Sequence, residues 1–380
     1  MEPAPSLTHR GRDMDDHNAF VGLDVHKESI VIAVAETGRS GEVRFLGEIR
    51  NEAAAVVKLA RKLGRSYPSV LYACEAGGCG YGLHRQLTRL GHDCVVVAPS
   101  KIPRVVNDRV KNDRRDAVSL ARLLRADELS PVWVPDEGHE AMRDLVRTRH
   151  AAAEDLRKVR QRIQAFLLRH ERRYEGSPWK KMHAVWLGRQ QFDHPAQQIA
   201  FQGYLSGAAH AAARRDELEG QIRELLATWS FRPTVDAPQS LRGIALITAV
   251  TLVAEIGDIR RFQRPGELMA YLGLVPGERS SGATIRRGGI TKAGNSFARK
   301  MLVESAWSYR RPARIGVEMG ARMPEVADPV REIAWKAQIR LCGRFRRLAA
   351  RGKKSQIVVT AIARELVGFI WAVSQAATAA

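Results

Sequence analysis

Residues 20–36 read FVGLDVHKESIVIAVAE, and this stretch decides the fold of the first third of the chain. Two apolar runs of strand length flank a short polar turn at residues 26–28, a pattern typical of neighbouring strands. One carboxylate, Asp24, lies inside the apolar GLDV segment of the first run. A buried carboxylate without a partner is costly by several kcal/mol, so we expect a cation near Asp24.

Strand and helix patterns continue in a regular order up to residue 124. Apolar runs predict strands, and leucines and alanines at helical spacing predict helices. The predicted strands are residues 43–49, 70–74 and 94–98, and the predicted helices are residues 53–63, 82–90 and 113–124. Three consecutive strands, a helix, and then strand–helix–strand–helix is the order of a ribonuclease-H-like domain, an α/β fold with helices covering a mixed sheet.

Four carboxylates fall at positions that such a fold would use for catalysis. Asp24 lies in the first strand and Glu75 closes the fourth. Asp113 and Asp116 stand three residues apart at the start of the last helix, so they share one face. Clustered carboxylates suit Mg²⁺, and two such ions can hold the attacking and leaving oxygens of a phosphodiester. The four acids are therefore predicted to bind metal and to be catalytic.

Each of these acids also has an ordinary structural interpretation. Asp113 is a candidate helix N-cap, Asp116 a partner of the helix dipole, and Glu75 a strand-end acid. His26 is interpreted as a solvated turn residue rather than a ligand, and its neighbour Lys27 as a phosphate contact. The joint placement of the four acids on one topology favours the metal site.

The whole chain carries a large positive charge. Its 380 residues have a formal net charge of +20 and a pI near 10.4, which predicts a polyanionic partner. A membrane surface is disfavoured because no apolar run reaches the roughly 18–20 residues that span a bilayer, the longest being residues 243–256. Residues 1–18 lack a signal-peptide core and are predicted to be a disordered leader. The four cysteines, without CxxC spacing, indicate reduced thiols in a cytoplasmic protein.

The middle of the chain has the pattern of long helices. Apolar residues recur every three or four positions in residues 141–168 and again in residues 201–229, where Leu225 belongs to the stripe. Two such helices joined by residues 171–194 predict an antiparallel hairpin, a coiled-coil linker that could also dimerise. The stripe could equally be an intramolecular core.

The last part of the chain is predicted to be a mainly α domain. Gly243 precedes an apolar helix in a manner that resembles a helix-hairpin-helix, whose turn binds a DNA phosphate, although a second turn glycine is missing. Residues 276–295, PGERSSGATIRRGGITKAGN, combine two serines, glycines and cations. Such a loop can bring backbone N–H groups, cations and a hydroxyl to a phosphate, or it can be an ordinary flexible basic loop.

Nine basic residues and the backbone of Gly243 are predicted to contact nucleic acid, and a solvated basic face is the alternative for the basic residues. The basic residues are Lys27, Arg104, Lys111, Arg114, Arg115, Arg286, Arg287, Lys292 and Arg299.

The segments GLDVHKESI, CEAGGCGYG, VAPSKIPR, VKNDRRDA and LMAYLGLVPGERSSG…GGITKAGN occur in one order at long separations. Together they resemble the DEDD transposases of the IS110 insertion-sequence family over nearly the whole chain. The resemblance implies a RuvC-like domain at residues 19–128, a coiled-coil linker at 129–235 and a C-terminal transposase domain at 236–380. It places the four acids of the family on Asp24, Glu75, Asp113 and Asp116, and its nucleophilic serine on Ser281.

The resemblance also implies partners and a mechanism. Donor and target DNA would be paired with a noncoding bridge RNA, and dimers would associate into a tetramer in the bacterial cytoplasm, at the nucleoid. We therefore predict a transposase that rejoins DNA through a covalent serine–DNA intermediate with Mg²⁺ at the acids. The alternatives are a metal-dependent RuvC-like nuclease in which Ser281 only binds phosphate, and a non-catalytic nucleic-acid scaffold.

Overall fold

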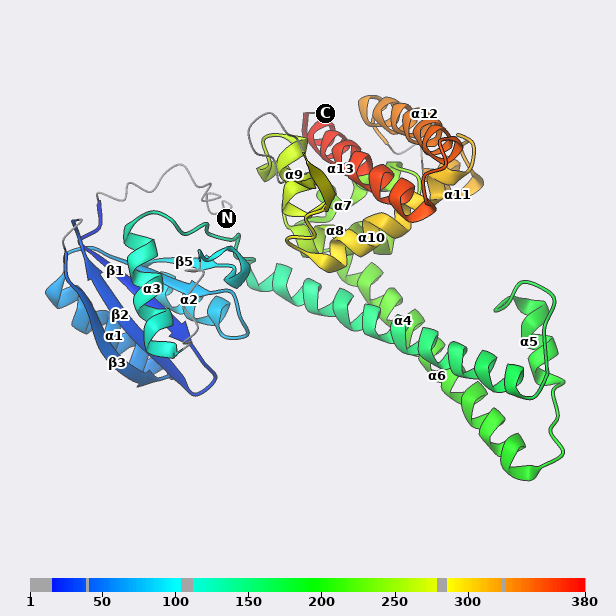
Figure 1. Cartoon of the computed structure of the whole chain (residues 1–380), viewed down its shortest axis with the longest axis horizontal. Coiled ribbons are helices and arrows are strands. Elements are labelled where there is room, and N and C mark those ends of the chain that lie inside the picture. The colour runs from blue at the N-terminus through cyan, green and yellow to red at the C-terminus, as the bar shows by residue number, and fades with distance from the viewer. Residues whose placement is uncertain (1–15, 39–40, 104–111, 279–285, 323–325, 380) are drawn as a thin grey trace. The chain divides into compact units, whose positions relative to one another are not determined.

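A computed structural model of the chain describes residues 16–38, 41–103, 112–278, 286–322 and 326–379. The chain divides after Val134 into two compact units, which are treated separately below (Figure 1). The long helical hairpin belongs to the second unit, whose first helix begins at Glu137. The division of this unit into a separate linker and a C-terminal domain stays a prediction.

A five-stranded mixed sheet forms the centre of the first unit. Its strands are β1 (Ala19–Val25), β2 (Ser29–Glu36), β3 (Val43–Arg50), β4 (Val70–Glu75) and β5 (Asp93–Val97). The order is β3-β2-β1-β4-β5, with β2 antiparallel to its neighbours β1 and β3, and with β4 and β5 parallel to β1. The predicted order of strands and helices and the mixed α/β sheet are confirmed.

Helices cover both faces of this sheet. The helices are α1 (Ala53–Ser66), α2 (Gly80–Arg89) and α3 (Asp113–Arg125). Leu23 and Cys74 pack with residues of α1 and α2 such as Val56, whereas Ala73 packs on the opposite face with Leu120 of α3. The alternation follows from the period of two in a strand, and it makes both faces of the sheet apolar.

The boundary of the predicted leader needs a correction at its end. His17 is 6% exposed, and its Nε2 lies 3.4 Å from Asp93 Oδ2. Its backbone oxygen accepts a hydrogen bond from Thr37 Oγ1 at 2.7 Å. Residues 16–18 therefore belong to the folded unit, and residues 1–15 lie outside the described residues.

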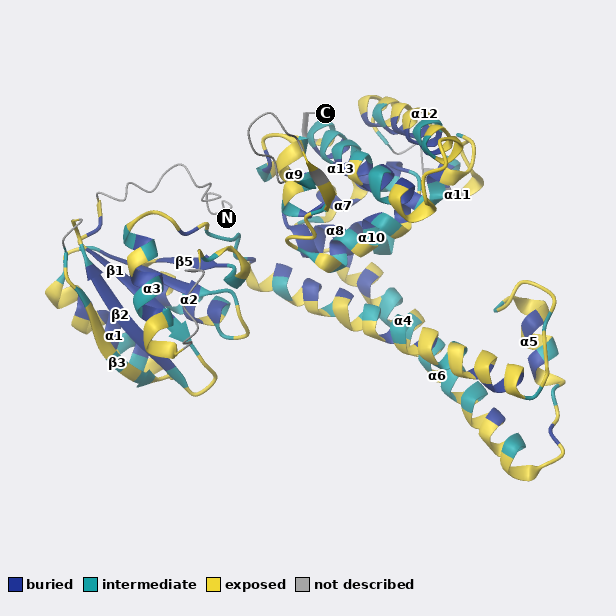
Figure 2. Ribbon diagram, viewed as in Figure 1, coloured by how far each residue is buried: buried dark blue, intermediate teal, exposed yellow. Residues whose placement is uncertain are grey.

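Two long helices dominate the start of the second unit. Helix α4 (Glu137–Arg169) runs beside α6 (Pro195–Leu226), and the short helix α5 (Lys181–Gly188) lies between them in sequence (Figure 1). The predicted hairpin is present, but Leu225 is 52% exposed and does not belong to its buried stripe. Figure 2 shows exposed residues along much of both helices. A coiled coil in the strict sense stays a prediction.

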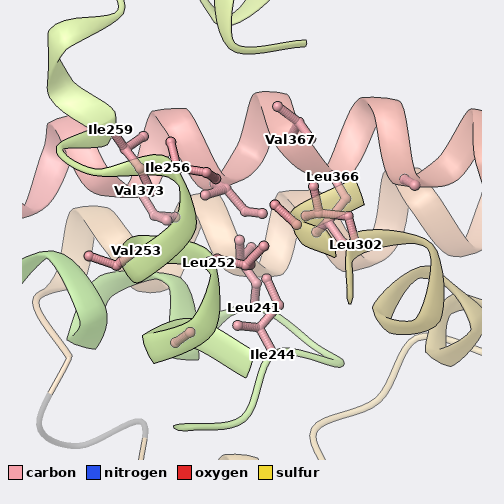
Figure 3. Packing of buried hydrophobic residues seen from close by; sticks show 14 of the residues in the cluster. Leu241, Ile244, Leu252, Val253, Ile256, Ile259, Leu302, Leu366, Val367 and Val373 are labelled. Carbon is pink, nitrogen blue, oxygen red and sulfur yellow. The ribbon is translucent and has the colours of Figure 1, made fainter. Parts of the chain in front are cut away.

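The remainder of the second unit is mainly helical. Its elements are α7 (Arg232–Asp236), α8 (Leu246–Ile256), α9 (Pro265–Tyr271), β6 (Pro276–Glu278), β7 (Arg287–Ile290), α10 (Ser296–Ala306), α11 (Val317–Arg322), α12 (Asp328–Ala350) and α13 (Ser355–Ala379). The core joins α8, α10 and α13 through residues such as Leu252, Leu302 and Leu366 (Figure 3). Met142 of α4 and Ile222 of α6 enter the same core, which ties the hairpin to these helices.

One prediction about apolar segments is wrong. Residues 355–377 of α13 have a mean hydropathy of 1.8 and are long and apolar enough to cross a bilayer, so residues 243–256 are not the longest such segment. Half of this span is buried, and Val358, Ile362 and Leu366 are completely covered within the core. A central core helix of a globular unit passes the same test of length and composition.

Candidate active site

The register of two parallel strands brings Asp24 and Glu75 to one edge of the sheet. Leu23 of β1 pairs with Cys74 of β4, so Asp24 and Glu75 are the next residues along the two strands. Side chains alternate between the faces of a sheet, and Leu23 and Cys74 point toward α1 and α2. Asp24 and Glu75 therefore emerge on the face that α3 covers.

A glycine lets α3 approach this face closely. A Cβ added at Gly22 would lie 2.2 Å from the backbone oxygen of Ala117 and 2.6 Å from the backbone nitrogen of Ala121. Any side chain at this position would push α3 away from β1. Asp24 lies two residues beyond Gly22, and Asp113 lies one helical turn before Ala117. The close packing thus brings the start of α3 to the end of β1.

The capping of α3 leaves Asp113 available for other contacts. Asn112 is the N-cap, and its Oδ1 accepts a hydrogen bond from the backbone nitrogen of Arg115 at 3.0 Å. The interpretation of Asp113 as the N-cap is therefore wrong. Asp113 and Asp116 both lie in the first turn, where the helix dipole stabilises negative charge.

His26 belongs to the acidic site rather than only to the turn. Its Nε2 lies 3.3 Å from Asp24 Oδ2 and 3.5 Å from Asp113 Oδ2, and its side chain is 45% exposed. One ligand atom from each of these three residues lies within 4.8 Å of the others. Sequence reasoning missed His26 as a site residue, although its position two residues after Asp24 was a usable signal.

Asp24 is the most buried member of the site. Its side chain is 13% exposed, and burial, its largest influence, raises the pKa of its carboxyl above the usual range. The negative charges of Asp116 and Asp113 act in the same direction, whereas His26 lowers this pKa. Within the described part of the chain, buried Asp24 Oδ2 accepts no hydrogen bond of good geometry, despite the nearby imidazole.

These residues fit a divalent metal ion. A cation would neutralise the buried carboxylate and supply the partner that Asp24 Oδ2 lacks among the described residues. The carboxylates from β1 and α3 are donors that Mg²⁺ and Mn²⁺ prefer, whereas the imidazole nitrogen is more typical of softer ions such as Zn²⁺. Asp116 acts on this group through its charge, and Glu75 is half-buried at the neighbouring strand end. The structure brings Asp24, His26 and Asp113 together; direct metal contact by Glu75 and Asp116 stays a prediction.

The predicted nucleophile Ser281 and its neighbour Ser280 lie outside the described residues, but the two sides of their loop are defined. Strands β6 and β7 pair antiparallel, with Pro276 opposite Ile290 and Glu278 opposite Arg287. Residues 279–285 are thus connected at both ends to one small hairpin.

Close backbone contacts hold the chain after this hairpin. Gly294 has a φ of +70°, and a Cβ there would lie 1.9 Å from the backbone oxygen of Tyr271. Gly273, with a φ of +64°, approaches Ala293 in the same way. Arg299 Nη1 donates to the backbone oxygens of Leu272 and Ala293, each at 2.9 Å. These contacts join the end of α9 to the segment that leads into α10.

A buried carboxylate anchors the N-cap of α10. Asn295 Oδ1 accepts a hydrogen bond from the backbone nitrogen of Ala298, and Asn295 Nδ2 donates to Glu255 of α8. The Glu255 side chain is 1% exposed and also accepts from Arg147 Nε at 2.7 Å and Nη2 at 2.9 Å. The segment between the serine loop and α10 is therefore connected by hydrogen bonds to both α8 and α4.

The predicted nucleic-acid contacts have varied surroundings. Lys27 is 91% exposed beside Glu28, and the Arg114 guanidinium lies 4.9 Å from the centroid of the Phe45 ring. Gly243 has a φ of +84° and packs against the backbone oxygen of Ser305, which explains the glycine by protein packing. Arg115, Arg286 and Lys292 are exposed. Arg104, Lys111 and the side chain of Arg287 lie outside what the structure describes. Nucleic-acid contact by these residues, and a helix-hairpin-helix function of the turn at Gly243, stay predictions.

An α/β unit that gathers acids at one sheet edge, joined to a helical unit with a polar serine-containing loop, defines the class of DEDD transposases, which use divalent metal ions. Two family models match the chain: a DEDD transposase model of the IS110 type at residues 21–171, and "Transposase IS116/IS110/IS902 family" at residues 237–315.

Individual relatives agree with this class. The y4qE protein of Sinorhizobium fredii, a transposase by name, is 52% identical over 378 residues, covering 99% of this chain and 94% of that protein. The transposase for insertion sequence element IS1533 of Leptospira borgpetersenii is 31% identical over 341 residues, covering 88% of this chain and 98% of that protein. The chain belongs to the IS110 family of insertion-sequence transposases and is an enzyme that acts on DNA.

Proposed function

We propose that this transposase cuts and rejoins DNA as a recombinase, with Ser281 as the nucleophile and Mg²⁺ held by the acids of the first unit. The observation that carries the proposal is the group formed by Asp24, His26 and Asp113, in which a buried carboxylate oxygen needs a cation. Glu75 and Asp116 would complete the ligands. Bound Mg²⁺ would offset the negative charge of the scissile phosphate and help a hydroxyl to lose its proton.

The proposed reaction exchanges one phosphate ester for another. Ser281 Oγ forms a bond to phosphorus while the bond from phosphorus to one DNA oxygen breaks, and that oxygen leaves as a hydroxyl after it takes up a proton. Attack by a DNA hydroxyl on the phosphoserine reverses the step and releases the serine. No external nucleotide is required, because each phosphate ester replaces another of similar energy.

The basic residues near the serine loop have a role in this scheme. Arg286, Arg287 and Lys292 would stabilise charge on the phosphate, as cations do in charge-assisted hydrogen bonds. Arg299 instead connects the segments before and after the β6–β7 hairpin, since it donates to the oxygens of Leu272 and Ala293.

The proposed partners are donor and target DNA, a bridge RNA, and further copies of the chain. The net charge of +20 supports a nucleic-acid assembly. The dimer that pairs into a tetramer, the bridge RNA and a cytoplasmic site of action at the nucleoid rest on the resemblance to the family.

A trapping experiment tests the nucleophile. A DNA substrate with a nick near the cleavage site would hold a covalent intermediate, visible as a DNA-shifted protein band in denaturing gels. Wild type and Ser280→Ala should form the adduct, and Ser281→Ala should form none. Asp24→Asn should also lose cleavage.

Other outcomes would identify the alternatives. Cleavage without adduct by Ser281→Ala would indicate a metal-dependent nuclease in which the serine only binds phosphate. DNA binding without cleavage by wild type, in Mg²⁺ or Mn²⁺, would support the scaffold.

A further inference from the structure

The end of the helical hairpin, residues 157–194, concentrates positive charge. These 38 residues contain ten Lys and Arg and three Asp and Glu, a net charge of +7 out of +20 for the chain. A tenth of the sequence thus carries about a third of the excess charge. A small apolar cluster around Ile163, Phe166 and Phe201 holds this region together, and arginines such as Arg169 also pack on its rings.

A cavity opens between α4 and α6 in this region. Its volume is about 370 Å³, and its lining includes Arg157 and Arg160 from α4, Arg215 from α6, and Trp179 from the segment before α5. Burial and the neighbouring charge of Arg215, in that order, lower the pKa of Arg160, whereas the charge of Asp216 acts in the opposite direction. Arg215 Nε donates to Asp216 Oδ1 at 2.8 Å, so an anion bound here would use Arg160 first and would share Arg215 with this carboxylate.

Trp179 is fixed in a backbone conformation that few residues adopt. Its φ is +64°, and its backbone nitrogen donates to His183 Nδ1 at 3.1 Å. The Arg160 guanidinium lies 4.9 Å from the centroid of the indole ring. A left-handed conformation is unfavourable for a bulky residue, and such residues occur preferentially at functional sites.

An apolar cavity adjoins the first. It has a volume of about 290 Å³ and shares Leu156, Arg160 and Trp179 with its neighbour. Its other walls are apolar and come from residues such as Ile163 and Leu205. An open cavity lined by cations beside an open apolar one suits a ligand with an anionic part and an aromatic part, which is the chemistry of a nucleotide.

We propose that this pair of cavities is a binding site for a single-stranded nucleic-acid segment, with a phosphate near Arg160 and Arg215 and an unpaired base against Trp179 and the apolar wall. An anionic membrane surface would explain the charge but would not need two adjoining cavities of different polarity. The site does not depend on Ser281, so it can fail without affecting the proposed recombination chemistry.

The test measures binding of the full-length protein to fluorescent single strands of RNA and of DNA, to a duplex, and to an abasic strand of equal length. The variant Arg160→Gln/Arg215→Gln removes one cavity-lining cation from each of the two helices. Its control, Arg162→Gln/Arg173→Gln, removes two exposed cations from the same region that do not line either cavity. Trp179→Leu removes the ring, and Trp179→Phe keeps an aromatic face. Thermal unfolding of each variant verifies the fold.

We expect Arg160→Gln/Arg215→Gln to weaken single-strand binding about tenfold or more, and the control variant less than about threefold at the same ionic strength. Trp179→Leu should weaken binding of the ordinary strand about tenfold but leave binding of the abasic strand nearly unchanged. Trp179→Phe should retain most of the affinity. Tighter binding of the RNA strand or of the DNA strand then shows whether the bound segment is RNA or DNA.

Equal losses in the two double variants would overturn the proposal, because charge alone would explain them. An effect of Trp179→Leu on the abasic strand as large as on the ordinary strand would also overturn it. The same holds if vesicles rich in phosphatidylserine bind wild type as tightly as the single strands and respond to the same substitutions.

Discussion

The acidic site of the first unit and the serine-loop support of the second unit hold their residues by different means. Strand register and one helix packed on Gly22 place the acids, so regular secondary structure does most of the positioning. The serine loop is supported instead by left-handed glycines, backbone carbonyls held by Arg299 and the buried carboxylate of Glu255. The first kind of site depends on the packing of whole elements, whereas the second depends on many individual contacts.

The largest expected effect is that of Asp24→Asn. DNA cleavage should fall by about 10²–10³-fold, because the variant lacks the charge that a divalent cation would balance. The melting temperature of the metal-free protein should stay the same or rise. Burial disfavours the charged carboxylate of Asp24 and raises its pKa, and the neutral amide does not carry this cost. A large loss of thermal stability would contradict the metal site and assign Asp24 to the fold.

The approach of α3 to β1 is tested by Gly22→Ala. The added methyl meets the backbone oxygen of Ala117, so we expect a loss of about 3 kcal/mol in the free energy of unfolding, with reduced cleavage. Gly64→Ala in α1 is the matched control, because a Cβ there has nothing within 4 Å. The control should gain up to about 1 kcal/mol. Chemical denaturation measures both, and equal effects would refute the packing argument.

The support of the serine loop is tested by Glu255→Gln. The substitution breaks the ion pair with Arg147 and should lower the free energy of unfolding by about 2 kcal/mol. This is less than the loss expected for a fully buried pair, because the Arg147 side chain is 54% exposed. Cleavage should fall further than stability predicts, while metal binding to the first unit stays unchanged. The exposed control Glu224→Gln should change stability by less than about 0.5 kcal/mol. Altered metal affinity in Glu255→Gln would contradict the view that the acidic site and the serine loop are held independently.

A substitution at His26 tests whether this residue contributes to metal binding at the acidic site. His26→Gln should lower metal affinity or cleavage about tenfold, a typical effect of a residue that contacts or orients metal ligands. Lys27→Gln, at the exposed neighbouring position, should leave metal affinity unchanged. Calorimetric titration with Mn²⁺ distinguishes the two variants. If they behave identically, His26 is only a turn residue and has no role in metal binding.

The smallest effect concerns an ion pair near the serine-loop support. Lys300 and then Arg157 hold the pKa of Glu154 at about 2, below its usual 4.5. A depressed carboxyl pKa stabilises the fold above pH 4.5, and this contribution disappears as the pH falls from 4.5 toward 2. Since the pair is at the surface, Glu154→Gln should remove only about 0.5 kcal/mol at pH 7. A difference between wild type and variant that persists undiminished at pH 2 would contradict this assignment.

Regular structure was predictable from the sequence, and individual contacts were not. The fourth strand was predicted at residues 70–74 and is Val70–Glu75, because an apolar strand bounded by turns has a clear pattern. The start of α6 at Pro195 was missed by six residues, since its Gln-rich first turns lack apolar spacing. His26 and Asn112 were missed as well, because their roles depend on a turn and a cap that bring side chains together in space. The contacts of Gly22 and Gly294 require tertiary packing that no local pattern records.

Helix α4 connects two separate apolar clusters, one containing Val146 and the other Ile163. These two residues are 17 positions apart, which corresponds to about 25 Å of helix. Inserting seven residues into both α4 and α6 would lengthen this spacer by about 10 Å while keeping the side chains in phase. The reach of the hairpin is therefore set by the length of this spacer, which can change in steps of seven residues without altering the packing at either end.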